Sequence, residues 1–288
     1  MDLVYLKLLN GLTTGALYAM TAFGLTFILG MLNIPNFAHG ALFALGGYVA
    51  YSIIQITGSF WWALLLAPPL LALFGAVLER GVLRHLYGSN PDDENYLLLA
   101  LFAMAVILQE VIIIIWGGAG ASSLPPQNLA GAVQLGPIFY PKFRLFLLAI
   151  SAAVILLAWL FIERTRAGAL IRAAIENREA VMLLGVDIRI LFAASFALGA
   201  FLTALAGVLS LPVRGLHPFI GMDILVISFV VVVVGGLGNL YGAIFAGLLI
   251  GLIQEFATYI NPLASWLTIY LTMMLVLLLR PNGLFGSR

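Results

Sequence analysis

Near its start the sequence contains a long stretch without charge. No Lys, Arg, Asp or Glu occurs in residues 8–78, a run of 71 residues. A helix that crosses a bilayer needs about 20 apolar residues, so this run has room for three crossings. The whole chain of 288 residues is 63% hydrophobic and 9% charged, whereas soluble domains carry about 25% charged residues. These features predict an integral membrane protein.

The apolar runs favour helices over a β-barrel. Inside a bilayer the backbone polar groups must be satisfied within the protein, which leaves only helices and closed barrels. Barrel strands alternate apolar and polar residues over about ten positions, but residues 145–162 (LFLLAISAAVILLAWLFI) are continuously apolar. The predicted fold is an all-α membrane protein, built as a polytopic helical bundle.

Charges and Gly, Pro or Asn positions divide the chain into about eight to ten transmembrane segments of a single domain, residues 1–288. The predicted spans are residues 8–30, 38–56, 61–80, 97–116, 145–162 and 190–212, then two long or three shorter spans within residues 224–279. Breaks at residues 235–239 and 261–262 favour three. The run after Lys7 is longer than the apolar region of a signal peptide, so the first span is expected to remain in the mature protein.

The distribution of basic residues predicts the orientation. Cytoplasmic loops carry the excess of Lys and Arg. Nine of the 13 basic residues fall on one side of the predicted topology, and these are Arg80, Arg84, Arg164, Arg166, Arg172, Arg178, Arg189, Arg280 and Arg288. Residues 163–189, here called the charged loop, and the C-terminus are therefore predicted to be cytoplasmic. Nine crossings with the N-terminus outside satisfy this count, and a re-entrant first or seventh segment would change the number without moving the charged loop.

Several functions are excluded by what the sequence lacks. It has no Cys, and its three His are not spaced as metal ligands, so we expect no metal site. No phosphate-binding loop and no catalytic constellation occur, so we expect no catalytic residues and no nucleotide site in this chain. The basic residues lie in connecting segments and form no basic face, which argues against a nucleic-acid partner. If the protein uses ATP, another protein binds it.

The charged loop is predicted to form two helical parts. Residues 166–175 are expected to continue as a helix beyond the membrane. Asn177 is placed to cap a second, short helix from Arg178 to Leu184, with Glu179 in its first turn and Gly185 as a left-handed stop. Residues 181–184 (VMLL) form an apolar knob on this helix, which suits a hydrophobic groove on a partner protein. The alternative is an amphipathic helix that lies on lipid.

The charged loop resembles the coupling loop of ABC importer permeases. Residues 179–185 (EAVMLLG) are similar to the Glu-Ala-Ala-x-x-x-Gly motif of those permeases, and residues 172–186 (RAAIENREAVMLLGV) resemble the same loop in LivH-type branched-chain amino acid permeases. Further resemblance lies in residues 33–40 (NIPNFAHG) with 45–48 (LGGY), in residues 235–243 (GGLGNLYGA) and in residues 280–286 (RPNGLFG). Val181 replaces the second Ala of the general motif, and the Leu-Pro that often ends the longer pattern is missing.

This resemblance implies a permease subunit of an ATP-driven importer in a bacterial or archaeal cytoplasmic membrane. The implied partners are two cytoplasmic ATPases that bind ATP and Mg²⁺, a second permease of a different, LivM-type chain, and an extracytoplasmic substrate-binding protein, besides membrane lipid. The solutes would be branched-chain amino acids or related small polar molecules. The residues expected to contact the ATPases are Glu176, Asn177, Arg178, Glu179, Ala180, Leu184 and Gly185.

Two interrupted segments are candidates for the substrate pathway. Free N–H groups at the start of a helix after a break carry partial positive charge, which suits a substrate carboxylate. The predicted pathway residues are Asn33, Asn36, His39, Gly40, Gly236 and Asn239. The alternative is structural: the Asn side chains cap the break and His39 packs in the interior. Residues 40–46 (GALFALG) and 242–247 (GAIFAG) echo one another, which suggests an internal repeat or else small-residue helix packing.

Glu110 and Glu255 are the only acids predicted to lie deep within spans, so each is expected to face protein or water. They also define the alternative function, a secondary transporter of small polar solutes driven by an ion gradient. Such a carrier needs intramembrane acids to couple the ion, whereas an ATP-driven permease tolerates their neutralisation. A membrane enzyme is disfavoured because no catalytic constellation is visible.

Overall fold

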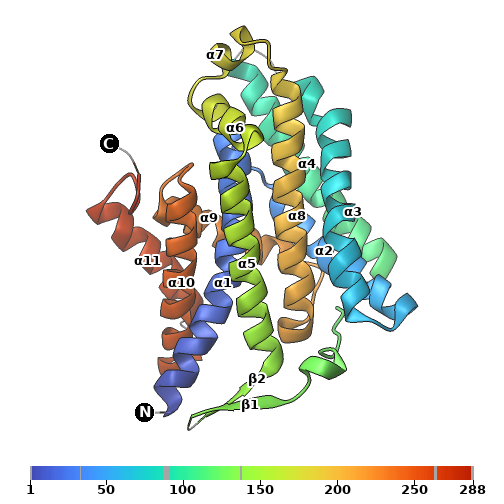
Figure 1. Cartoon of the computed structure of the whole chain (residues 1–288), viewed down its shortest axis with the longest axis vertical. Coiled ribbons are helices and arrows are strands. Elements are labelled where there is room, and N and C mark those ends of the chain that lie inside the picture. Colours follow the sequence, from blue (N-terminus) through green and yellow to red (C-terminus); the bar gives the residue numbers. More distant parts are fainter. Residues whose placement is uncertain (1, 33, 87–90, 137, 263–264, 287–288) are drawn as a thin grey trace.

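The computed structural model describes residues 2–32, 34–86, 91–136, 138–262 and 265–286, and Figure 1 shows them as a helical bundle. In order, the elements are α1 (Asp2–Leu32), α2 (Ala38–Thr57), α3 (Phe60–Gly81), the 3₁₀ helix η1 (Leu83–Leu86), α4 (Pro91–Trp116), η2 (Gln127–Leu129), β1 (Ala132–Leu135), β2 (Ile138–Pro141), α5 (Lys142–Arg164), α6 (Arg166–Glu176), α7 (Arg178–Leu183), α8 (Ile188–Arg214), α9 (Ile220–Gly235), α10 (Leu240–Ile260) and α11 (Ser265–Leu279).

Seven helices in the described residues are long and apolar enough to cross a membrane, namely α1, α2, α3, α4, α5, α8 and α10. Two apolar helices, α9 and α11, are shorter, with 16 and 15 residues. At 1.5 Å per residue, α9 is about 24 Å long, less than the roughly 30 Å of the hydrocarbon core. The predicted division of residues 224–279 into three segments, with breaks at residues 235–239 and 261–262, is confirmed, but α9 begins earlier, at Ile220, and only α10 is long enough to count as a span.

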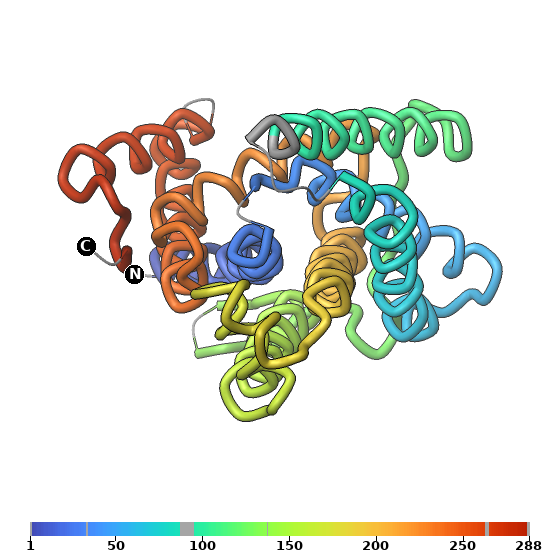
Figure 2. Tube along the Cα trace, turned by 90° about the horizontal axis from the view of Figure 1, so that it is seen from above, coloured from blue at the N-terminus to red at the C-terminus, as the bar shows by residue number. Residues whose placement is uncertain are grey.

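Helices α1 and α8 form the centre of the bundle, and Figure 2 shows the other helices arranged around them. Helix α10 packs along α1 through small residues spaced four apart, Gly11 and Gly15 on α1 and Gly247 and Gly251 on α10. A Cβ atom on Gly251 would lie 2.3 Å from the Cα of Gly15, so this approach requires glycine. Membrane helices associate through such small-residue faces because lipid offers no hydrophobic driving force between them.

The first break in the bundle lies between α1 and α2. The side chain of His39, near the start of α2, donates from Nε2 to the carbonyl oxygen of Thr21 on α1 at 2.9 Å. The Thr21 hydroxyl in turn accepts a hydrogen bond from Ser228 of α9 at 3.1 Å. Helix α2 therefore begins beside the middle of α1 rather than beyond its end. Irregular backbone is tolerated at this depth because protein surrounds it.

The structure corrects several predicted boundaries. Helix α1 begins at Asp2 rather than at residue 8, because Lys7 forms an ion pair with Glu255 of α10 (2.9 Å) and so remains within the helix. Helix α4 begins at Pro91 rather than at residue 97, which shortens the expected polar loop. The breaks after α1 and after α2 lie where they were predicted, and Gly58 ends α2 in the left-handed conformation with φ 67°.

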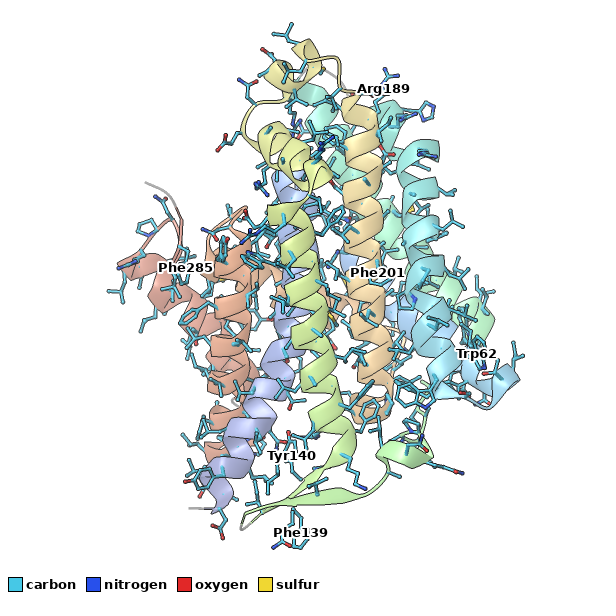
Figure 3. The ribbon with its side chains drawn as sticks, viewed as in Figure 1. Trp62, Phe139, Tyr140, Arg189, Phe201 and Phe285 are labelled. Carbon is cyan, nitrogen blue, oxygen red and sulfur yellow. The ribbon has the colours of Figure 1, made fainter. Side chains whose placement is uncertain are left out.

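A β-hairpin lies in the segment that was predicted to be a loop, residues 117–142. Strands β1 and β2 pair antiparallel, with Leu135 opposite Ile138. Along β2 buried and exposed residues alternate, so Tyr140 points into the bundle while Phe139 points away from it, as Figure 3 shows. The Tyr140 hydroxyl lies 3.0 Å from that of Thr13 on α1. The hairpin covers the end of the bundle opposite α7 (Figure 1).

Candidate functional site

The charged loop projects from one end of the bundle as helices α6 and α7 (Figure 1). Helix α6 (Arg166–Glu176) begins directly after α5, with Thr165 as its N-cap accepting a hydrogen bond from the Gly168 N–H at 3.0 Å. The tight turn requires Gly168, because a Cβ atom there would lie 2.1 Å from the carbonyl oxygen of Ile162. The predicted helix at residues 166–175 is confirmed.

Helix α7 has the predicted caps. Asn177 is its N-cap, and its Oδ1 accepts a hydrogen bond from the Ala180 N–H at 3.0 Å. Glu179 lies in the first turn, where the helix dipole favours a negative charge. Gly185 follows with φ 80°, the left-handed conformation expected of the stop. The helix ends at Leu183 instead of Leu184, which is the C-cap residue. Local sequence signals therefore define α7 almost to the residue.

The apolar knob is exposed except for one of its residues. Leu183 and Leu184 are 89% and 78% exposed, and Met182 is also exposed. Val181, which was predicted to belong to the exposed knob, is only 2% exposed, and this part of the prediction is wrong. Residues three apart share a helix face, so Val181 turns inward together with Arg178. A helix of six residues presents one face outward and must bury the other.

The remaining predicted coupling residues lie at the surface of the charged loop. Glu176, Asn177, Glu179, Ala180 and Gly185 are all exposed. Together with Leu183 and Leu184 they form one projecting surface with apolar residues at its tip and carboxylates at its base. Such a surface suits a protein groove with an apolar floor and basic rim. Arg178 does not belong to this surface, because its side chain is partly buried and directed into the bundle.

The structure gives structural contacts to three of the predicted pathway residues near the first break. Asn36 is fully buried, and its Oδ1 accepts a hydrogen bond from the Ala38 N–H at 3.0 Å. His39 is also fully buried against Thr21. Gly40 allows α9 to cross α2, since a Cβ atom on it would lie 2.0 Å from the carbonyl oxygen of Gly221. Asn33 lies outside the described residues.

The other two predicted pathway residues bind the C-terminal tail. Asn239 caps α10 by accepting a hydrogen bond from the Gly242 N–H at 2.9 Å, and its side-chain amide donates to the Phe285 carbonyl at 2.8 Å. Gly236 has φ 107° and lies against the tail, where a Cβ atom would be 2.7 Å from the Gly286 nitrogen. The two motifs at residues 235–243 and 280–286 therefore pack on each other, a pairing that the sequence did not reveal.

The two acids that were predicted to lie deep within spans have different surroundings. Glu255 pairs with Lys7 and accepts a hydrogen bond from Asn10 at 3.2 Å. It therefore faces protein, as predicted. Glu110 is exposed on the surface of α4, two helical turns before the helix ends at Trp116.

In the described part of the chain, no three of His, Cys, Asp and Glu are grouped so as to hold a metal ion.

The chain is 29% identical to the high-affinity branched-chain amino acid transport system permease protein BraD of Pseudomonas aeruginosa, over 97% of this chain and 95% of BraD. It is 26% identical to LivH of Escherichia coli, over 97% of this chain and 94% of LivH.

Among solved structures, the chain is similar to PsaBC from Streptococcus pneumoniae in complex with Fab. The match has a TM-score of 0.50 and 15% identity, and covers 94% of this chain and 89% of that one. This likeness concerns the fold alone. The model of the family described as "Branched-chain amino acid transport system / permease component" matches residues 7–279. The chain belongs to this family of membrane permeases.

Proposed function

We propose that the chain is the permease subunit of an ATP-driven ABC importer for branched-chain amino acids or related small polar solutes. The observation that carries the proposal is the exposed end of α7, a capped helix that holds Leu183 and Leu184 away from the bundle. Contiguous exposed apolar residues, here Met182 to Leu184, mark a site of interaction with a partner. Family membership identifies the setting as a transport complex, and the chain itself acts as a transducer and a path, not as an enzyme.

The partners follow from this assignment. Two cytoplasmic ATPases, which bind ATP and Mg²⁺, would receive α7 in a surface groove. A second permease, of a different LivM-type chain, would complete the translocation path, and an extracytoplasmic binding protein would deliver the solute. We propose that the ATPases contact Glu176, Asn177, Glu179, Ala180, Leu184 and Gly185, and also Met182 and Leu183, whose exposure supports the same role.

The mechanism is alternating access driven through the charged loop. Closure of the ATPases moves α7, and the helices of the bundle rock around a central path. We propose that the first break borders this path, where Asn36 and His39 lie at the start of α2. The irregular backbone of the break would let the last turn of α1 shift, while His39 and Gly40 keep the start of α2 packed against α1 and α9. Gly236 and Asn239 would act at the second break, through their contacts with the C-terminal tail.

Neutralising Glu110 and Glu255 tests whether the protein is an ATP-driven importer or an ion-driven carrier. The variants Glu110→Gln and Glu255→Gln are expected to retain uptake within about twofold of the wild type, because Glu255 serves an ion pair with Lys7 rather than proton coupling. Uptake is measured in proteoliposomes that contain the full complex and ATP. Loss of uptake in either variant, with the complex still assembled, would point to the ion-driven carrier.

Co-purification tests the assignment itself. The tagged chain is expressed with its cognate ATPases and second permease, purified in lipid, and assayed for ATP hydrolysis with and without the binding protein. We expect the ATPases to co-purify in equal amount with the permeases, and the binding protein to stimulate hydrolysis. A well-folded permease that brings down no ATPase would refute the importer assignment.

A further inference from the structure

The side chain of Arg178 points away from the exposed surface of α7 and into the bundle. Its Nη2 donates a hydrogen bond to the carbonyl oxygen of Met31 at 2.6 Å. Its Cζ lies 5.3 Å from the ring centroid of Phe192 on α8, in the geometry of a cation–π contact. One side chain at the start of α7 thus contacts both central helices of the bundle, α1 and α8.

Met31 lies in the last turn of α1, which ends at Leu32. Carbonyl groups in the last turn have no partner within the helix, and they carry the negative end of the helix dipole. A guanidinium is therefore well suited to this position, because it supplies both a donor and a positive charge. The hydrogen bond attaches the start of α7 to the end of α1.

A second contact joins the same two segments independently. Ile175 in the last turn of α6 packs over Gly30 of α1, where a Cβ atom would lie 3.3 Å from Ile175 Cδ1. Consecutive residues of α1, 30 and 31, are therefore held by residues 175 and 178 of the charged loop. Val181, one turn further along α7, is buried on the same face as Arg178. The inward face of the loop is packed, while the outward face stays exposed.

The end of α1 leads directly into the first break of the bundle. After residues 34–37, helix α2 begins beside the middle of α1, where His39 is bonded to Thr21. The start of α2, on the other side of the break, is held in place by this hydrogen bond. Displacement of the last turn of α1 therefore changes the backbone geometry of the break. Helix packing is bistable rather than continuously deformable, so a small shift at this point can become a change of state.

We propose that Arg178 is a positioning residue that carries the motion of α7 to the break between α1 and α2, and that it is not a contact to the ATPase. The proposal rests on the importer function, and it corrects the place of Arg178 among the coupling residues. The exposed residues 176, 177, 179, 180 and 182–185 hold the ATPase, whereas Arg178 makes the loop and the end of α1 move as one body.

The substitution Arg178→Ala distinguishes a role in binding the ATPase from a role in carrying the motion of α7 to α1. The variant is expected to co-purify with the ATPases as the wild type does, while solute uptake per ATP hydrolysed falls by about tenfold, the loss expected for a partly buried charged hydrogen bond. Arg178→Lys keeps a charged donor for the Met31 carbonyl and should recover part of the coupling. Arg189→Ala is the matched control, because Arg189 is exposed on the same loop (Figure 3) and should behave as the wild type.

A reversible covalent link provides the sharper test. The chain has no Cys, so the pair Gly30→Cys and Ile175→Cys introduces the only thiols of this subunit, at two positions in contact. In the Arg178→Ala background, oxidation is expected to restore coupled uptake and a reductant to remove it again. When Arg178 is kept, the subunit with the oxidised cysteine pair should transport at the wild-type rate, because the charged loop and the end of α1 already move together.

Three results would overturn the inference. Release of the ATPases by Arg178→Ala would make Arg178 a docking residue. If Arg178→Ala transports as much solute per ATP as the wild type, Arg178 has no role in coupling. If the disulfide blocks uptake in the protein that keeps Arg178, the loop and α1 must slide past each other during transport. This measurement remains decisive even if Arg178→Ala fails to fold. Failure of the importer assignment is distinct, because then the wild type itself brings down no ATPase.

Discussion

Replacing Leu183 with aspartate is expected to abolish co-purification of the ATPases and, with it, ATP-dependent uptake. Leu183 is 89% exposed at the end of α7, so the substitution leaves the packing of the permease unchanged. In the complex it would place a carboxylate in an apolar groove, where an unpaired charge is strongly unfavourable. Central apolar anchors of interfaces contribute about 2 kcal/mol or more, so affinity should fall at least roughly thirtyfold.

The matched control is Leu124→Asp. Leu124 is also 89% exposed, but it lies in the segment between α4 and η2, which is toward the end of the bundle opposite α7 (Figure 1). That variant should keep the ATPases bound. Because both variants replace an exposed leucine with aspartate, a difference in ATPase co-purification between them is due to the position of the residue. Retention of the ATPases by Leu183→Asp at wild-type stoichiometry would contradict the docking role of α7. Thermal unfolding of both purified variants verifies that the permease itself is intact.

Replacing Gly40 with alanine is expected to destabilise the bundle severely. The added Cβ would lie 2.0 Å from the carbonyl oxygen of Gly221 and 2.7 Å from Leu225 Cβ, so α9 cannot cross α2 without moving. Overpacking a tight contact costs about 1–3 kcal/mol, and the obstacle here is backbone, which gives way least. The expected result is a large fall in thermal stability and in the yield of monodisperse protein, measured by scanning fluorimetry and size exclusion.

Gly81→Ala is the control for Gly40→Ala. Gly81 ends α3, has no positive φ, and a Cβ there meets nothing within 4 Å. Alanine is intrinsically about 1 kcal/mol better than glycine inside a helix, so this change should be neutral or slightly stabilising. If Gly40→Ala unfolds at the same temperature as Gly81→Ala, the close crossing of α2 and α9 is wrong. If it folds normally and only uptake is lost, Gly40 acts in the pathway rather than in packing.

The sequence predicted best those features that depend on nearby residues. The caps of α7 were predictable because Asn177 and Gly185 act on groups within a few positions of themselves. The break after residue 32, the stop at Gly58 and the division of residues 224–279 into three segments follow from Gly, Pro and Asn interrupting apolar runs. Family resemblance in the charged loop supplied the function that composition alone left open.

Features that depend on distant contacts were not predictable in the same way. Arg178 carries no local sign that it turns inward, because its partners on α1 and α8 are set by the tertiary fold, and the same holds for the burial of Val181. Asn239 was assigned to the pathway, yet it binds the carbonyl of Phe285, 46 residues away. In a chain rich in Val, Ile and Leu throughout, the β-propensity of residues 132–141 did not stand out from the helical background.

The most direct test of the account is ATP-driven uptake of labelled leucine into proteoliposomes that contain the whole complex. The binding protein is supplied outside, ATP inside, and ionophores collapse every ion gradient. We expect uptake to persist without gradients, to require ATP, and to disappear in Leu183→Asp. Uptake that proceeds without ATP, or that stops when the gradients collapse although ATP is present, would contradict the importer assignment.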